Sequence, residues 1–149
     1  MSANEELFKN FLETNYIEYK IPKKDSFSID CVPFNKSGIY KPDFYIPCKD
    51  LYIEIKGFMT LHAVNKLKYL LLKRLPLNFC ILQMTDETWI SEVFNDKSLT
   101  SIAKKLDNSI QQQFKEIKEL SAKELHDLSL LRLDEYLRSN QEELEKWLK

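Results

Sequence analysis

Apolar and polar side chains alternate with a period of two along three segments in the first half of the chain. These segments are residues 25–34, 40–47 and 51–57. Successive side chains of a strand point to opposite faces, so the pattern predicts three β-strands, each with one apolar face. In the third segment that face consists of Leu51, Ile53 and Ile55. The short link at 48–50 predicts that the second and third strands form an antiparallel hairpin.

Helical spacing of apolar residues marks two further segments. Residues 3–15 carry such a stripe and reach a plausible stop at Asn15, and residues 60–75 carry another that ends before Pro76. The continuous apolar run at 77–84 is typical of a buried strand in a β-α-β unit. The order helix, three strands, helix, strand predicts an α/β protein with a mixed sheet.

From Ser98 onward the chain is polar and its pattern is helical. Ser121 and Glu124 form a capping box that opens a helix to about Leu137, and Asn140 with Glu143 marks a short further one. We therefore expect a core at 1–97 and a helical C-terminal extension at 98–149. The apolar stripe of this extension has no obvious sheet to cover, which favours oligomerisation, with DNA contact as a second role.

Composition narrows the class of protein. The chain has 149 residues and a net charge of −1, so any DNA contact must come from local basic patches. No apolar run is long enough to span a membrane, and the first residues lack a signal pattern, so we expect a cytoplasmic protein. The three cysteines are widely spaced, unlike the ligands of a zinc site, and we expect reduced thiols.

Charged side chains occupy one face of the predicted hairpin. Alternation puts Asp43 on the same face as Glu54 and Lys56, and cross-strand pairing brings the two carboxylates together. Paired carboxylates on a rigid sheet favour a bound cation, and hard oxygen ligands suit Mg²⁺. Lys56 is placed to orient or deprotonate a water, or to stabilise charge on a phosphate. The set predicts metal-assisted phosphodiester hydrolysis.

The sequences "PDF" at 42–44 and "EIK" at 54–56 resemble the signature of the PD-(D/E)XK, or restriction-endonuclease-like, nuclease superfamily. The resemblance covers about residues 4–84 and is strongest to phage-type endonuclease I Holliday-junction resolvases and small homing endonucleases of this fold. It implies an αβββαβ core. It also implies that Asp43, Glu54 and the Ile55 carbonyl hold Mg²⁺, which Mn²⁺ can replace, and that Lys56 is catalytic. The family often adds an acid on the first helix, for which Glu5 is the better match and Glu6 the fallback.

The expected function is a Mg²⁺-dependent endonuclease that cuts double-stranded or branched DNA as a homodimer or homotetramer. A defined target sequence, as for a homing endonuclease, and a four-way junction, as for a resolvase, both stay open. The alternative class is a non-catalytic nuclease fold that serves as a DNA-binding or protein-interaction module. Candidate DNA contacts, which equally fit a solvated surface, are Lys23, Lys24, Lys36, Lys41, His62 and Lys66.

Overall fold

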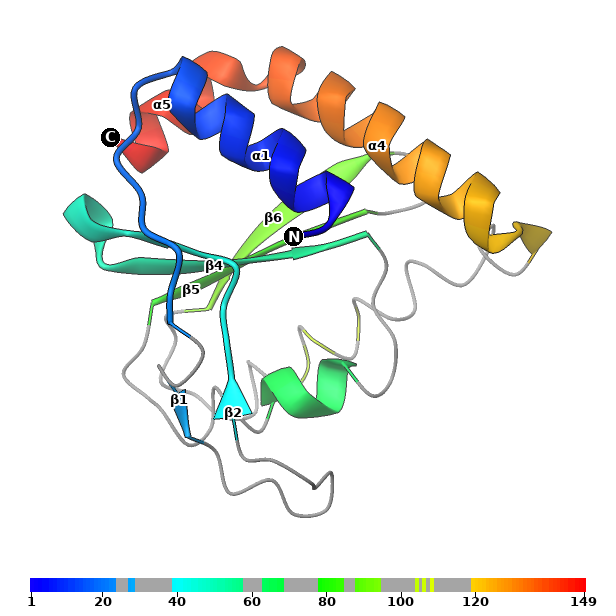
Figure 1. Cartoon of the computed structure of the whole chain (residues 1–149), viewed down its shortest axis with the longest axis horizontal. Coiled ribbons are helices and arrows are strands. Elements are labelled where there is room, and N and C mark those ends of the chain that lie inside the picture. Colours follow the sequence, from blue (N-terminus) through cyan, green and yellow to red (C-terminus); the bar gives the residue numbers. More distant parts are fainter. Residues whose placement is uncertain are drawn as a thin grey trace.

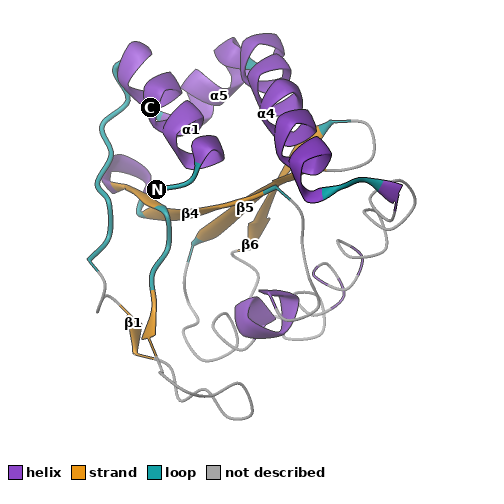
Figure 2. Ribbon diagram, turned by 45° about the vertical axis from the view of Figure 1, so that its right-hand side comes forward, coloured by secondary structure: helices purple, strands orange, loops and turns teal. Residues whose placement is uncertain are grey.

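The computed structural model describes residues 1–23, 27–28, 39–57, 63–68, 78–84, 88–94, 104, 106, 108 and 119–149. Its centre is a four-stranded mixed sheet with the strand order β3 (Phe44–Ile46), β4 (Leu51–Lys56), β5 (Phe79–Met84) and β6 (Trp89–Phe94). The helices α1 (Ala3–Thr14), α4 (Ala122–Ser139) and α5 (Gln141–Leu148) lie together on one face (Figure 1). Helical residues 63–68 lie on the opposite side of the sheet (Figure 2).

The hairpin and the crossover are confirmed. β3 pairs with β4 in the antiparallel direction, and the link between them is a 3-10 turn at Pro47–Lys49 followed by Asp50 in the left-handed conformation. β4 and β5 are parallel, as the predicted β-α-β unit requires, and every residue of β5 is buried.

The predicted strand at 40–47 is wrong as one continuous element. β2 (Ile39–Tyr40) pairs with β1 (Phe27–Ser28) in a separate two-stranded sheet, and β3 starts only at Phe44. The interruption contains Pro42, which has no N–H to donate to a ladder. The rest of the segment predicted as a strand at 25–34 lies outside the described residues.

The fourth strand of the central sheet is β6, which the sequence did not predict. β6 runs antiparallel to β5, and Trp89 at its start is fully buried. Its sequence "WISEVF" mixes apolar and polar residues on both faces, so it lacks the clean alternation of a half-buried strand. The α/β class with a mixed sheet is confirmed.

The first helix begins and ends as the sequence predicts. Ser2 caps α1, because its hydroxyl accepts from the Glu5 N–H while the Glu5 carboxylate accepts from the Ser2 N–H. Asn15 is the C-cap, and Tyr16 follows with φ 57°. The N–H of Ile17 then donates to the Leu12 carbonyl at 2.9 Å, which completes a Schellman motif.

The C-terminal helices pack on the sheet, so the expectation that their apolar stripe has no sheet to cover is wrong for α4 and α5. The capping box at Ser121 is confirmed, but the Asn140 side chain does not cap α5; its amide donates to the Tyr136 carbonyl. Leucines of both helices share the core of α1 and the hairpin: Leu133, Leu137, Leu144 and Leu148.

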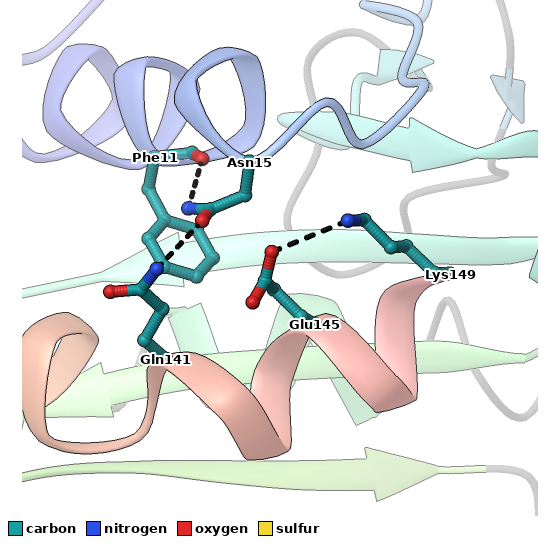
Figure 3. Close-up of polar contacts among 5 residues, drawn as sticks. All are labelled: Phe11, Asn15, Gln141, Glu145 and Lys149. Carbon is teal, nitrogen blue, oxygen red and sulfur yellow. Dashed lines mark hydrogen bonds and ion pairs between the residues drawn. The ribbon is translucent and has the colours of Figure 1, made fainter.

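Polar contacts also join the end of α1 to the start of α5 (Figure 3). Gln141 Nε2 donates to Asn15 Oδ1 at 3.0 Å, and Asn15 Nδ2 donates to the Phe11 carbonyl at 2.8 Å. Asn15 is 7% exposed, so both halves of its buried amide have a partner. The first and last helices are therefore parts of one layer.

Within the described segments, no helix is both long and apolar enough to cross a membrane.

Candidate functional site

The structure brings Asp43 and Glu54 together from neighbouring strands. The Asp43 N–H donates to the Ile53 carbonyl at 3.1 Å, and Asp43 Oδ2 accepts from the Ile55 N–H at 2.8 Å. The side chain therefore continues the β3–β4 ladder by one hydrogen bond where the β3 backbone leaves it. Glu54, on the neighbouring strand, is only 5% exposed. Both carboxylates lie toward the carboxyl end of β4, the usual location of ligands in α/β sheets.

The raised pKa of Asp43 shows that negative charge is in excess around its carboxyl group. Burial, the charge of Glu54 and, to a smaller extent, the charge of Glu5 raise the pKa of Asp43, which is about 8 in the folded protein. The hydrogen bond from the Ile55 N–H and the charge of Lys56 act in the opposite direction. A carboxyl group in such surroundings holds a proton at neutral pH unless a cation takes its place.

Lys56 neutralises part of this charge. Its Nζ lies 3.5 Å from Glu54 Oε1, and the two side chains are 33% and 7% exposed. They are two residues apart on one strand, so they project from the same face. On β5, Gln83 is directly opposite Lys56 and is 1% exposed. The ammonium group thus lies between a buried acid and the surface.

Of the two acids on the first helix, Glu5 is the one whose charge acts on Asp43. Glu6 is exposed, and its charge acts instead on Tyr19. Glu5 also accepts the 3.4 Å hydrogen bond from the Ser2 N–H, so it serves the helix cap as well. The helix start therefore contributes a third negative charge to the surroundings of Asp43.

A polar cluster that the sequence did not reveal holds this helix start in place. Asn4 Nδ2 lies 3.3 Å from the hydroxyl of Ser129 on α4, and Gly57 at the end of β4 packs against both side chains. Trp89 Nε1 donates to the Ser129 carbonyl at 3.0 Å. Ser129 is 3% exposed. The available signal was a serine spaced by four from Leu125 and Leu133 on the apolar stripe of α4.

The donor set fits a hard cation better than a soft one. Within the described part of the chain, no three His, Cys, Asp or Glu side chains gather as a metal site. Asp43 and Glu54 offer carboxylate oxygens, and the Ile55 carbonyl points to the same edge of β4 as its N–H, toward Asp43. Mg²⁺ accepts so few protein ligands, because waters and substrate phosphates complete its octahedron.

The predicted DNA contacts are only partly within the described residues. Lys23 and Lys41 are exposed on the chain segments that flank β3, and Lys66 is partly exposed on the helix at 63–68. Lys24, Lys36 and His62 lie outside the described residues. Both exposed lysines precede Asp43 in the sequence, and Lys41 is two residues away from it.

The site combines two carboxylates from adjacent strands, a lysine and a helix-borne acid, over one sheet edge. Comparison of the chain with protein-family models, with curated proteins and with solved structures gives no significant match in any of the three.

Proposed function

We propose that the protein is a Mg²⁺-dependent endonuclease that hydrolyses DNA phosphodiester bonds. The observation that carries the proposal is the charge balance at Asp43: burial and the Glu54 carboxylate raise its pKa to about 8, with Lys56 3.5 Å from Glu54. A buried and a partly buried carboxylate that repel each other beside a lysine are costly in a fold that uses them only for structure. A divalent cation would relieve the repulsion.

Asp43 and Glu54 would hold the Mg²⁺, with the Ile55 carbonyl as a further ligand, and Mn²⁺ is expected to substitute. The bound ion supplies Lewis-acid stabilisation of the phosphate and lowers the pKa of a bound water. Lys56 lies close enough to Glu54 to orient or deprotonate the attacking water, or to stabilise the charge that develops on phosphate oxygens. Glu5 adds negative charge from the helix side.

DNA is the proposed substrate because these residues are arranged to direct a water onto a phosphodiester, and the signature they form resembles that of DNA endonucleases. Lys23 and Lys41 are exposed near β3 and supply positive charge for backbone contact. Cuts in both strands of a duplex or junction need two sites, so the proposal includes a symmetric homodimer or homotetramer. Since the apolar stripes of α4 and α5 are used in the core, such contacts would involve other surfaces.

A non-catalytic nuclease-like module is the second candidate, and one contact favours it. The ion pair between Lys56 and Glu54 neutralises the buried glutamate without a metal, and Asp43 completes a strand ladder. Both carboxylates therefore have partners within the protein and do not need a metal ion.

The deciding experiment is incubation of the purified protein with supercoiled plasmid and with a four-way junction, in Mg²⁺ and in EDTA. We expect Mg²⁺-dependent cleavage that is lost in Asp43→Ala and Lys56→Ala and retained in Lys49→Ala, an exposed lysine of the hairpin turn. Cleavage that is unchanged in the first two variants would exclude this site. No cleavage of either DNA would favour the non-catalytic module.

A further inference from the structure

One row of side chains crosses the sheet face that carries Glu54. The backbone register pairs, in turn, Lys20, Tyr45, Tyr52, Phe79 and Phe94, from an isolated bridge at one edge through β3, β4 and β5 to β6. Directly paired residues project from the same face of a sheet. The row therefore joins one lysine to four neighbouring aromatic rings.

The row is exposed to solvent at its lysine end and buried at the other end. Phe79 and Phe94 are buried, whereas Tyr45 and Tyr52 are partly exposed and Lys20 is exposed. The two tyrosine rings contact each other, with centroids 4.6 Å apart and planes inclined by 36°. Core packing accounts for the phenylalanines, but it leaves a paired aromatic surface next to a positive charge at the sheet edge.

Both ends of Tyr45 are held in place. The backbone of Lys20 exchanges two hydrogen bonds of 2.8 Å with the backbone of Tyr45. The phenol of Tyr45 donates to Asp50 Oδ1 at 2.7 Å, and this bond is the main reason that its pKa rises to about 12. The ring is therefore oriented before any ligand arrives and is uncharged at neutral pH. A preorganised surface loses less entropy when it binds a ligand.

The row lies beside the candidate site. Tyr52 and Glu54 are two residues apart on β4, so their side chains share a face at a separation of about 7 Å. Tyr45 stands in the same relation to Asp43 on the partner strand. A nucleotide next to a phosphate held by a metal ion at the two carboxylates would reach the tyrosine pair.

We propose that Lys20, Tyr45 and Tyr52 form a nucleotide-binding ledge that holds the nucleotide adjacent to the cleaved phosphate. Lys20 contacts a phosphate of the DNA backbone, and an unstacked base packs on the tyrosine pair. The assignment rests on the proposed nuclease function and adds to it residues that hold the substrate. A positive charge next to an aromatic pair matches the phosphate and the base of one nucleotide, which is why we assign a nucleic acid as the occupant.

The test measures binding apart from cleavage. Fluorescence anisotropy of a labelled four-way junction, in Ca²⁺ or EDTA, is compared for the wild type and for Tyr45→Leu, Tyr45→Phe and Lys20→Gln. Tyr45→Leu keeps apolar bulk in the hairpin but removes the aromatic face. Tyr16→Leu is the matched control, because Tyr16 is 90% exposed and lies after α1. Thermal unfolding of each variant verifies that it is folded.

Tyr45→Leu is expected to weaken binding about tenfold. Tyr45→Phe keeps the ring but loses the hydrogen bond to Asp50, so it is expected to weaken binding less than Tyr45→Leu, and Tyr16→Leu is expected to leave binding unchanged. Lys20→Gln is expected to reduce the slope of log K against log salt by about one. Wild-type affinity in both Tyr45→Leu and Lys20→Gln, in a protein that still cleaves DNA, overturns the ledge and leaves the proposed function standing. If the wild type neither binds nor cleaves DNA, the proposed function fails and the ledge fails with it.

Discussion

Gly57 ends β4 in contact with Asn4: a Cβ built on the glycine would lie 3.1 Å from Asn4 Nδ2. The backbone of Gly57 does not have a positive φ, so the space rather than the conformation restricts this position. The Asn4 amide is held by the hydroxyl of Ser129, 3.3 Å away. A methyl group at position 57 must therefore displace a side chain that joins the first helix to α4.

Gly57→Ala is accordingly expected to lower the free energy of unfolding by about 1 kcal/mol through this steric overlap. Asn4→Ala in the same chain removes the overlapping group, so Gly57→Ala should cost less in that background. Urea unfolding of the wild type, both single variants and the double variant gives the coupling energy directly. Additive losses would mean that the two residues do not restrict each other.

Asp43 is expected to make the stability of the metal-free protein depend on pH. Its pKa is raised from 3.8 to about 8 in the folded state, so the folded protein keeps a proton that the unfolded chain releases. The associated stability is fully present below pH 3.8, declines as the pH rises, and is lost above about pH 8. Asp43→Asn keeps an acceptor for the Ile55 N–H but does not titrate.

Thermal unfolding in EDTA across this range tests the effect. Asp43→Asn should match the wild type near pH 4 and exceed it in melting temperature at pH 8. Glu142→Gln, a change at an exposed acid of α5, provides the control and should follow the wild type throughout. Parallel curves for the wild type and Asp43→Asn would refute a raised pKa at Asp43.

Mg²⁺ is expected to raise the melting temperature of the wild type, since an ion that binds only the native state stabilises it. At 100 times its dissociation constant, a ligand contributes about 2.7 kcal/mol. The carboxylates must be deprotonated to bind, so the increase should be larger at pH 8 than at pH 6. Differential scanning fluorimetry of the wild type and Asp43→Asn measures it. An equal increase in both proteins would place the metal elsewhere.

Lys56→Met should separate the two roles of the lysine. Loss of a group that acts on the attacking water is expected to reduce cleavage about 10²- to 10⁴-fold. The substitution also removes the ammonium group that lies 3.5 Å from Glu54, which is 5% exposed, so the metal-free variant should melt at a lower temperature. Mg²⁺ should then restore the melting temperature but not the activity.

Lys49→Met is the matched control for this variant. Full activity in Lys56→Met would show that the lysine has no part in the mechanism.

Tyr16→Gly is expected to stabilise the protein. Tyr16 occupies the left-handed position of the Schellman motif after α1 with φ 57°, and its side chain is 90% exposed. Glycine adopts this conformation without steric cost. The strain that it relieves in the folded state exceeds the extra conformational entropy that it gives to the unfolded chain. The expected gain is up to about 1 kcal/mol in urea unfolding. Tyr16→Ala keeps a Cβ at this position and should show no gain.

The sequence was sufficient for the elements whose signals are local. The extent of α1, the hairpin that presents Asp43 and Glu54, and the strand character of β5 all follow from short patterns. The alternation along 51–56 also placed Lys56 on the same face as Glu54, and the 3.5 Å contact agrees with that. Local periodicity decides these features because each depends on residues close together in the chain.

Features that depend on contacts between distant residues could not be predicted from the sequence. β6 carries polar residues on both faces, and its place in the sheet is set by pairing with β5. Ser129 resembles a simple interruption of an apolar stripe until Asn4 and Trp89 are seen to bind it. Nor does the sequence indicate that α4 and α5 cover the sheet, because an amphipathic helix does not specify its partner.

The contact between Asn4 and Ser129 joins residues 125 positions apart, and this has a consequence for synthesis. A ribosome that adds about 5–20 residues per second needs about 6–25 s to travel between them. During that interval the start of α1 lacks the α4 partner that holds Glu5 beside Asp43. The site of the nascent chain is therefore incomplete until α4 has been synthesised, and any activity that needs Glu5 beside Asp43 would be delayed until then.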